Sequence, residues 1–71
     1  MQTKWVLEIY DSGRKNCLIS MHEFDDFSSL RTKIVENGAC RFLIDPPEHA
    51  TSSEFQCLLD LRGEGFELER K

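Results

Sequence analysis

The chain has 71 residues, of which 39% are hydrophobic and 31% charged, and its formal net charge is −4. This length allows one domain with a small core, which we place at residues 1–71. The longest apolar runs are three residues, far short of the ~20 that a membrane span needs. We expect no secretory signal, and three widely spaced cysteines without a CxxC motif are typical of reduced, buried thiols in a cytoplasmic protein.

Two alternating segments at the start of the chain predict a β-hairpin. From Lys4 to Tyr10, the side chains of Trp5, Leu7 and Ile9 fall on one side of a strand. The polar segment 11–16 suits a turn. From residue 17 to residue 24 the alternation resumes, and we expect Cys17, Ile19 and Met21 on one side and Leu18, Ser20 and His22 on the other.

A helix and a strand follow. Asp25 and Asp26 are expected to end the second strand and cap a helix whose apolar stripe is Phe27, Leu30 and Ile34. Gly38 suits the position just past this helix. Residues 39–45 then predict a central strand, which the two prolines at 46 and 47 end.

The last third of the chain fits two structures. Thr51-Ser52-Ser53-Glu54 matches a capping box, with Phe55, Leu58 and Leu59 on one helical face and a Schellman ending at Gly65 and Phe66. The same stretch also alternates like a strand, which would make a C-terminal β-hairpin. We favour the helix, because Glu, Gln and Leu are helix formers and the stretch has no β-branched residue. A short strand over 66–69 follows.

The predicted fold is therefore α+β, with the order β-β-α-β-α-β. Right-handed crossovers place both helices on one face of a mixed four-stranded sheet, as a two-layer sandwich. The helix-facing side is expected to hold Trp5, Leu7, Ile9, Ile19, Met21, Phe42, Ile44 and Leu68. The opposite side of the sheet is left uncovered.

This uncovered side is the candidate binding surface. Val6, Tyr10, Leu18 and Leu43 make it more apolar than a face that meets only water, and such a patch marks a partner site or a dimer seam. The candidate partner-binding residues are Val6, Tyr10, Leu18, His22, Arg41 and Leu43. We predict a protein–protein interaction module, such as a regulator, inhibitor or subunit. The first such interaction that we predict is a homodimer, which Leu43→Asp should disrupt.

No pattern in the sequence predicts catalysis. Neither His22 nor His49 belongs to a metal-ligand motif, and of the clustered carboxylates Glu23, Asp25 and Asp26 two are expected to cap a helix. Asp45, at the end of the central strand, has no nucleophile, glycine-rich loop or positive partner in the sequence. We therefore expect no enzyme activity, no cofactor and no metal site. With so small a core, a substrate pocket of ordinary size is also hard to form.

The charge is unevenly distributed. Residues 1–41 are neutral overall, whereas residues 42–71 hold three basic and seven acidic residues. The alternative function is nucleic-acid binding or processing through the basic first hairpin, where Lys4, Arg14 and Lys15 lie near Trp5 and Tyr10. The acidic remainder repels phosphate, so we expect no binding to DNA or RNA at about 150 mM salt, where charges are screened beyond ~8 Å.

Overall fold

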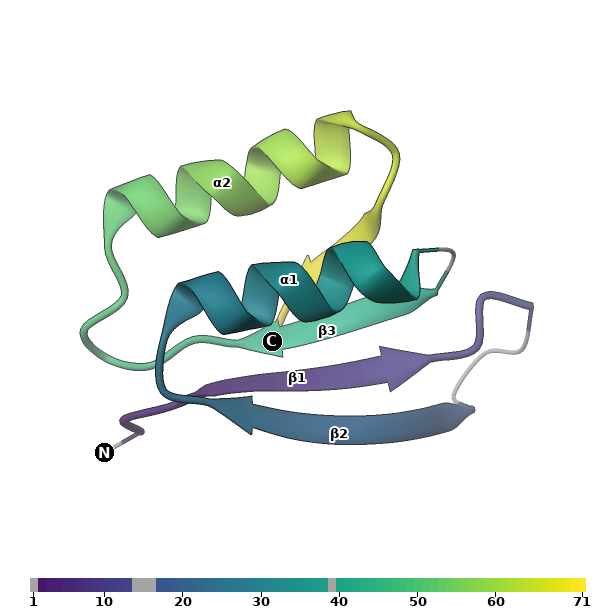
Figure 1. Cartoon of the computed structure of the whole chain (residues 1–71), viewed down its shortest axis with the longest axis horizontal. Coiled ribbons are helices and arrows are strands. Elements are labelled where there is room, and N and C mark those ends of the chain that lie inside the picture. Colours follow the sequence, from purple (N-terminus) through teal and green to yellow (C-terminus); the bar gives the residue numbers. More distant parts are fainter. Residues whose placement is uncertain (1, 14–16, 39) are drawn as a thin grey trace.

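The computed structural model describes residues 2–13, 17–38 and 40–71. Its elements follow the predicted order β-β-α-β-α-β. They are β1 (Trp5–Tyr10), β2 (Leu18–Phe24), α1 (Phe27–Asn37), β3 (Arg41–Asp45), α2 (Ser52–Gly63) and β4 (Glu67–Arg70). The four strands form one mixed sheet, and both helices lie on the same side of it, as Figure 1 shows. The predicted two-layer α+β sandwich is confirmed.

The strand order in the sheet is β2-β1-β3-β4. β1 is antiparallel to both β2 and β3, and β3 is parallel to β4. The hairpin β1–β2 therefore contributes one half of the sheet, and α1 carries the chain across β1 to β3. α2 then makes the second crossover to β4 at the sheet's end. As predicted, β3 is central, and the outer strands are β2 and β4.

The core lies between the helices and one face of the sheet. Trp5, Leu7 and Ile9 of β1 are almost completely buried, as are Leu30 and Ile34 of the predicted α1 stripe. Trp5 contacts both helices, because its ring lies 5.1 Å from that of Phe27 and 6.3 Å from that of Phe55. The other buried core residues are Phe42, Ile44, Leu58, Leu61 and Leu68.

Local signals at the ends of α2 decide that residues 52–63 are helical. The Thr51 hydroxyl accepts a hydrogen bond from the Glu54 N–H (3.2 Å), and the Glu54 carboxylate accepts one from the Thr51 N–H (2.8 Å). At the other end, the N–H of Phe66 donates to the carbonyl of Leu61, and that of Gly65 (φ 111°) donates to Arg62. These are the two bonds of a Schellman motif. The helix prediction is confirmed, and the alternative C-terminal hairpin is wrong.

The prediction for the two sides of β2 is wrong. Residues paired directly across a sheet share a side, and His22 pairs with buried Leu7, Ser20 with Ile9, and Phe24 with Trp5. The helix-facing residues of β2 are therefore Ser20, His22 and Phe24. The predicted arrangement would have placed Glu23 beneath the helices with Met21, at the cost of burying a charge. The observed register buries Phe24 there instead, and Ile19 and Met21 are exposed.

Smaller differences concern single side chains. Leu59 was expected on the buried stripe of α2, but it is exposed and Leu61 takes the buried position. Asp26 occupies the N-cap position of α1, yet its side chain makes no capping hydrogen bond. The three cysteines are unpaired as predicted but only half-buried. The predicted basic residues Arg14 and Lys15 lie outside the described residues.

Candidate interaction face of the sheet

The sheet face opposite the helices, which we call the open face, presents one set of side chains from each strand. Its rows follow from the strand register, because paired residues point the same way. One row runs Leu18, Tyr10, Arg41, Glu67; the next runs Met21, Glu8, Leu43, Glu69; the third runs Glu23, Val6, Asp45. With Lys71, which contacts Glu8, the open face has five acidic and two basic residues.

Apolar side chains gather over β2 and β1 on this face. Leu18 and Met21 are 50% and 60% exposed, and Ile19 beside them, at the irregular point of the β1–β2 register, is 58% exposed. Val6 and Leu43 are half-buried neighbours on β1 and β3. We call Val6, Leu18, Met21 and Leu43 the open-face patch. Large apolar side chains this exposed on neighbouring positions are typical of a surface that another molecule covers.

A carboxylate lies at the centre of the open-face patch. Glu8 is 8% exposed and sits between Met21 and Leu43 in the register. The Tyr10 hydroxyl donates a hydrogen bond to its Oε1 at 2.6 Å, and the Lys71 ammonium donates one to its Oε2 at 2.9 Å. Both carboxylate oxygens thus have partners within the chain. Another protein could cover this group without leaving a charge unpaired, which would otherwise oppose binding.

This network shifts the ionisation of its three members. The hydrogen bond from Tyr10, followed by that from Lys71, holds the pKa of Glu8 below its ordinary value. The hydrogen bond to Glu8 raises the pKa of Tyr10 and also raises the pKa of Lys71. Glu8 therefore stabilises the fold above the pKa of an unfolded glutamate and loses this effect as the pH falls through its own lower pKa. The contributions of Tyr10 and Lys71 are lost at alkaline pH, as each folded pKa is passed.

The phenol of Tyr10 offers a direct test of the network. It is the only tyrosine of the chain, so the near-ultraviolet absorbance of phenolate reports it alone. We expect the phenol to ionise above pH ~10, the ordinary value, because its neutral form donates to Glu8. Glu8→Gln should lower the midpoint toward that value, while Glu23→Gln, on the same face but outside the network, should leave it unchanged. Equal midpoints in all three proteins would contradict the network.

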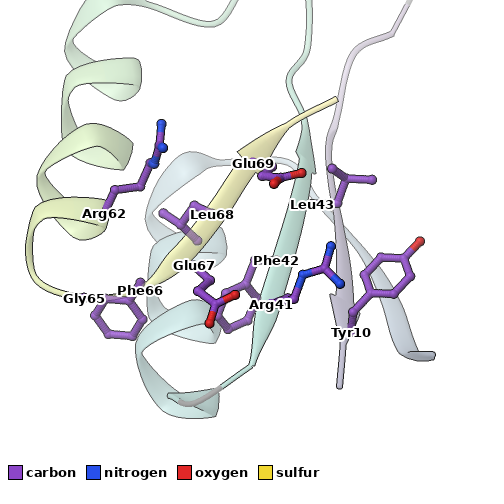
Figure 2. A pocket seen from close by; sticks show the side chains of 10 residues that line it. All are labelled: Tyr10, Arg41, Phe42, Leu43, Arg62, Gly65, Phe66, Glu67, Leu68 and Glu69. Carbon is purple, nitrogen blue, oxygen red and sulfur yellow. The ribbon is translucent and has the colours of Figure 1, made fainter. Parts of the chain in front are cut away.

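A hollow of about 510 Å³ lies at the β4 end of the open face (Figure 2). Tyr10, Arg41 and Leu43 line it from β1 and β3, and Glu67 and Glu69 line it from β4. The Arg41 guanidinium lies 5.9 Å from the centre of the Tyr10 ring, within the range of a cation–π contact. The hollow thus combines the aromatic ring of Tyr10 with both basic and acidic side chains.

Of the six predicted partner-binding residues, the structure brings five together. Val6, Tyr10, Leu18, Arg41 and Leu43 share the open face. His22 does not: it lies on the helix-facing side, where its Nε2 is 3.0 Å from the Ser20 hydroxyl and its ring stacks on Phe24. Met21 also belongs to the open face, although its place in the alternation of β2 predicted the helix-facing side. The link between Glu8 and Tyr10 was not predicted, although their spacing of two residues places them on one side of a strand.

The described residues offer little for other chemistry. Within residues 2–13, 17–38 and 40–71, no group of three or more His, Cys, Asp or Glu side chains is placed to hold a metal ion. None of the helices in this described part is both long and apolar enough to cross a membrane. No family model, curated protein or solved structure matches this chain. The open face therefore has to be interpreted from its own residues.

Proposed function

We propose that this chain is a small protein–protein interaction module, a regulator, inhibitor or subunit, that binds another protein chain through the open face. The observation that supports it most is the exposure of Leu18 and Met21 on a sheet face that no helix covers. The acidic excess of the same face argues against a nucleic-acid partner, whose phosphates it would repel. The first partner to test is a second copy of the chain.

A two-fold pairing is compatible with the charges of the open face. The open-face patch lies on the β2–β1–β3 side of the sheet, whereas Glu67 and Glu69 lie on β4 at its other end. If two copies meet face to face about an axis that passes through the patch and runs parallel to the strands, their β4 strands lie at opposite ends of the dimer. The acidic side chains of β4 then stay apart, and the apolar patch meets its own copy.

We expect the wild-type chain to self-associate at ~100 μM, a concentration that populates complexes with micromolar dissociation constants. Leu43→Asp and Met21→Asp should each abolish this association, because an Asp in the covered patch would lose its water without gaining a partner. Sedimentation equilibrium measures the effect as a fall in mass to the 8.3 kDa of one chain.

Val35→Asp is the matched control. Val35 is also an exposed apolar residue (46%), but it lies on α1, on the other side of the molecule from the open face. The Val35→Asp variant should therefore self-associate like the wild type. A wild type that sediments as 8.3 kDa, with Leu43→Asp melting at the same temperature, would rule out the homodimer.

A further inference from the structure

We infer that the outer edge of β4 binds an extended segment of another protein, with apolar and basic side chains in alternation, as a fifth strand of the sheet. This inference concerns a different surface from the open-face patch and does not depend on it. Its basis is the backbone of β4, the groove beside it and the charges on its two sides.

β4 has a strand neighbour on one edge only, since it ends the order β2-β1-β3-β4. The N–H of Lys71 donates to the carbonyl of Ile44 on β3 at 2.7 Å. Backbone groups of successive residues in a strand point to opposite edges, so those of Glu67 and Glu69 also point toward β3. The N–H and C=O groups of Leu68 and Arg70 therefore point outward. An added strand would pair with these two residues.

The helix side of this edge is an apolar groove. It has a volume of about 260 Å³, and Phe55, Leu58 and Leu59 of α2 line it opposite Leu68 of β4. Leu59 is 54% exposed, which the sequence analysis did not expect of a leucine on this helix. Every second side chain of an added strand would point into this groove and cover Leu59.

The other side of the edge carries two carboxylates of β4, with Arg41 of β3 beside Glu67 in the register. Glu67 and Glu69 project from β4 on the open-face side (Figure 2), and both residues are exposed. Among the residues that the structure describes, the ion pairs are Lys4–Asp25 and Lys71–Glu8, so neither carboxylate has an ionic partner there. The intervening side chains of an added strand would meet these carboxylates. Lysine or arginine suits those positions.

Arginines on the helix side make the orientation of the segment specific. The charged residues that line the apolar groove are Arg62, Arg70 and Glu69, so its net charge is positive, and the Arg70 guanidinium lies 4.3 Å from the centre of the Phe55 ring. A basic side chain directed into this groove would be repelled by this net positive charge. The basic residues of the segment must therefore lie on the side of Glu67 and Glu69.

A second copy of β4 does not fit this edge. In an antiparallel pair of two β4 strands about a two-fold axis perpendicular to the sheet, residues that point to the same side pair with each other. The registers centred on Glu67, Leu68 or Glu69 each place a glutamate opposite a glutamate of the other copy, and the register centred on Arg70 places the two arginines opposite each other. Like charges directly opposite each other destabilise a strand pair, so the charges favour a basic segment of a different protein.

The test uses a fluorescent peptide of alternating valine and lysine, VKVKVKVK, and a peptide of the same composition in two blocks, VVVVKKKK. Anisotropy titrations should show that the full chain binds the alternating peptide and that the block peptide binds about tenfold more weakly, since its lysines cannot all lie on one side of a strand. The double variant Glu67→Gln/Glu69→Gln should bind the alternating peptide about tenfold more weakly than the wild type does.

The control is Glu23→Gln/Glu36→Gln, which changes the net charge equally at exposed sites away from β4 and should bind like the wild type. Met21→Asp should also bind like the wild type, which separates this site from the open-face patch. Amide hydrogen exchange gives the specific signature: the peptide should slow exchange at Leu68 and Arg70. Unchanged exchange at these amides, or equal affinity of the two double variants, would overturn the inference. Slow exchange of the Leu68 and Arg70 amides in the chain alone at high concentration would also overturn the inference, because a second copy of the chain would then occupy the edge.

Discussion

Trp5→Ala should strongly destabilise the fold. Trp5 is 1% exposed and joins the two helices, through Phe27 of α1 and Phe55 of α2. Loss of such a side chain from a core costs about 3–5 kcal/mol. At about 0.05–0.15 kcal/mol per residue, a domain of this size has a total stability of only about 4–10 kcal/mol. The substitution therefore removes much of what holds the fold together.

Urea unfolding followed by far-ultraviolet circular dichroism measures this effect, since the variant lacks the only tryptophan and its fluorescence. Trp5→Phe is the control. It keeps an aromatic ring between Phe27 and Phe55, so its loss of stability should be clearly smaller than that of the alanine variant. If Trp5→Ala unfolded at the urea concentration of the wild type, Trp5 would not be the centre of the core.

Leu58→Asp should destabilise the fold far more than Leu59→Asp does, although the two residues are adjacent in the sequence. Leu58 is 8% exposed in the core, whereas Leu59 is 54% exposed beside the β4 groove. An Asp at position 58 would be an unpaired charge in an apolar environment, and we expect it to abolish cooperative folding or to cost several kcal/mol. At position 59 it should change the free energy of unfolding by less than about 0.5 kcal/mol, as exposed substitutions usually do.

Thermal unfolding of the two variants gives the comparison directly, with each protein serving as the control of the other. A strand alternation over 55–61 would place Leu59 inside with Phe55 and Leu61, and Leu58 outside. The reverse order of stabilities would therefore contradict the helix over Ser52–Gly63.

The elements and their order could be predicted from local patterns along the chain, with a choice between two structures left only for its last third. Signals within a few residues were enough for each one: alternation in β1 and β3, the apolar stripe of α1, the capping box at Thr51 and the glycines at 38 and 65. These patterns are reliable because backbone hydrogen bonding and steric limits act locally. The handedness of crossovers then placed both helices on one face.

The buried side of β2, by contrast, depends on packing against distant parts of the chain. Its residues alternate with apolar groups on both sides, and the choice depends on the distant partner Trp5, opposite which Phe24 packs against the core and Glu23 could not. The hydrogen-bond network of Glu8 also depends on distant packing, because its partner Lys71 lies 63 residues along the chain. It also holds for the groove that leaves Leu59 exposed at the edge of β4. Local patterns specify which side chains share a face, but the packing of distant segments decides which face is covered.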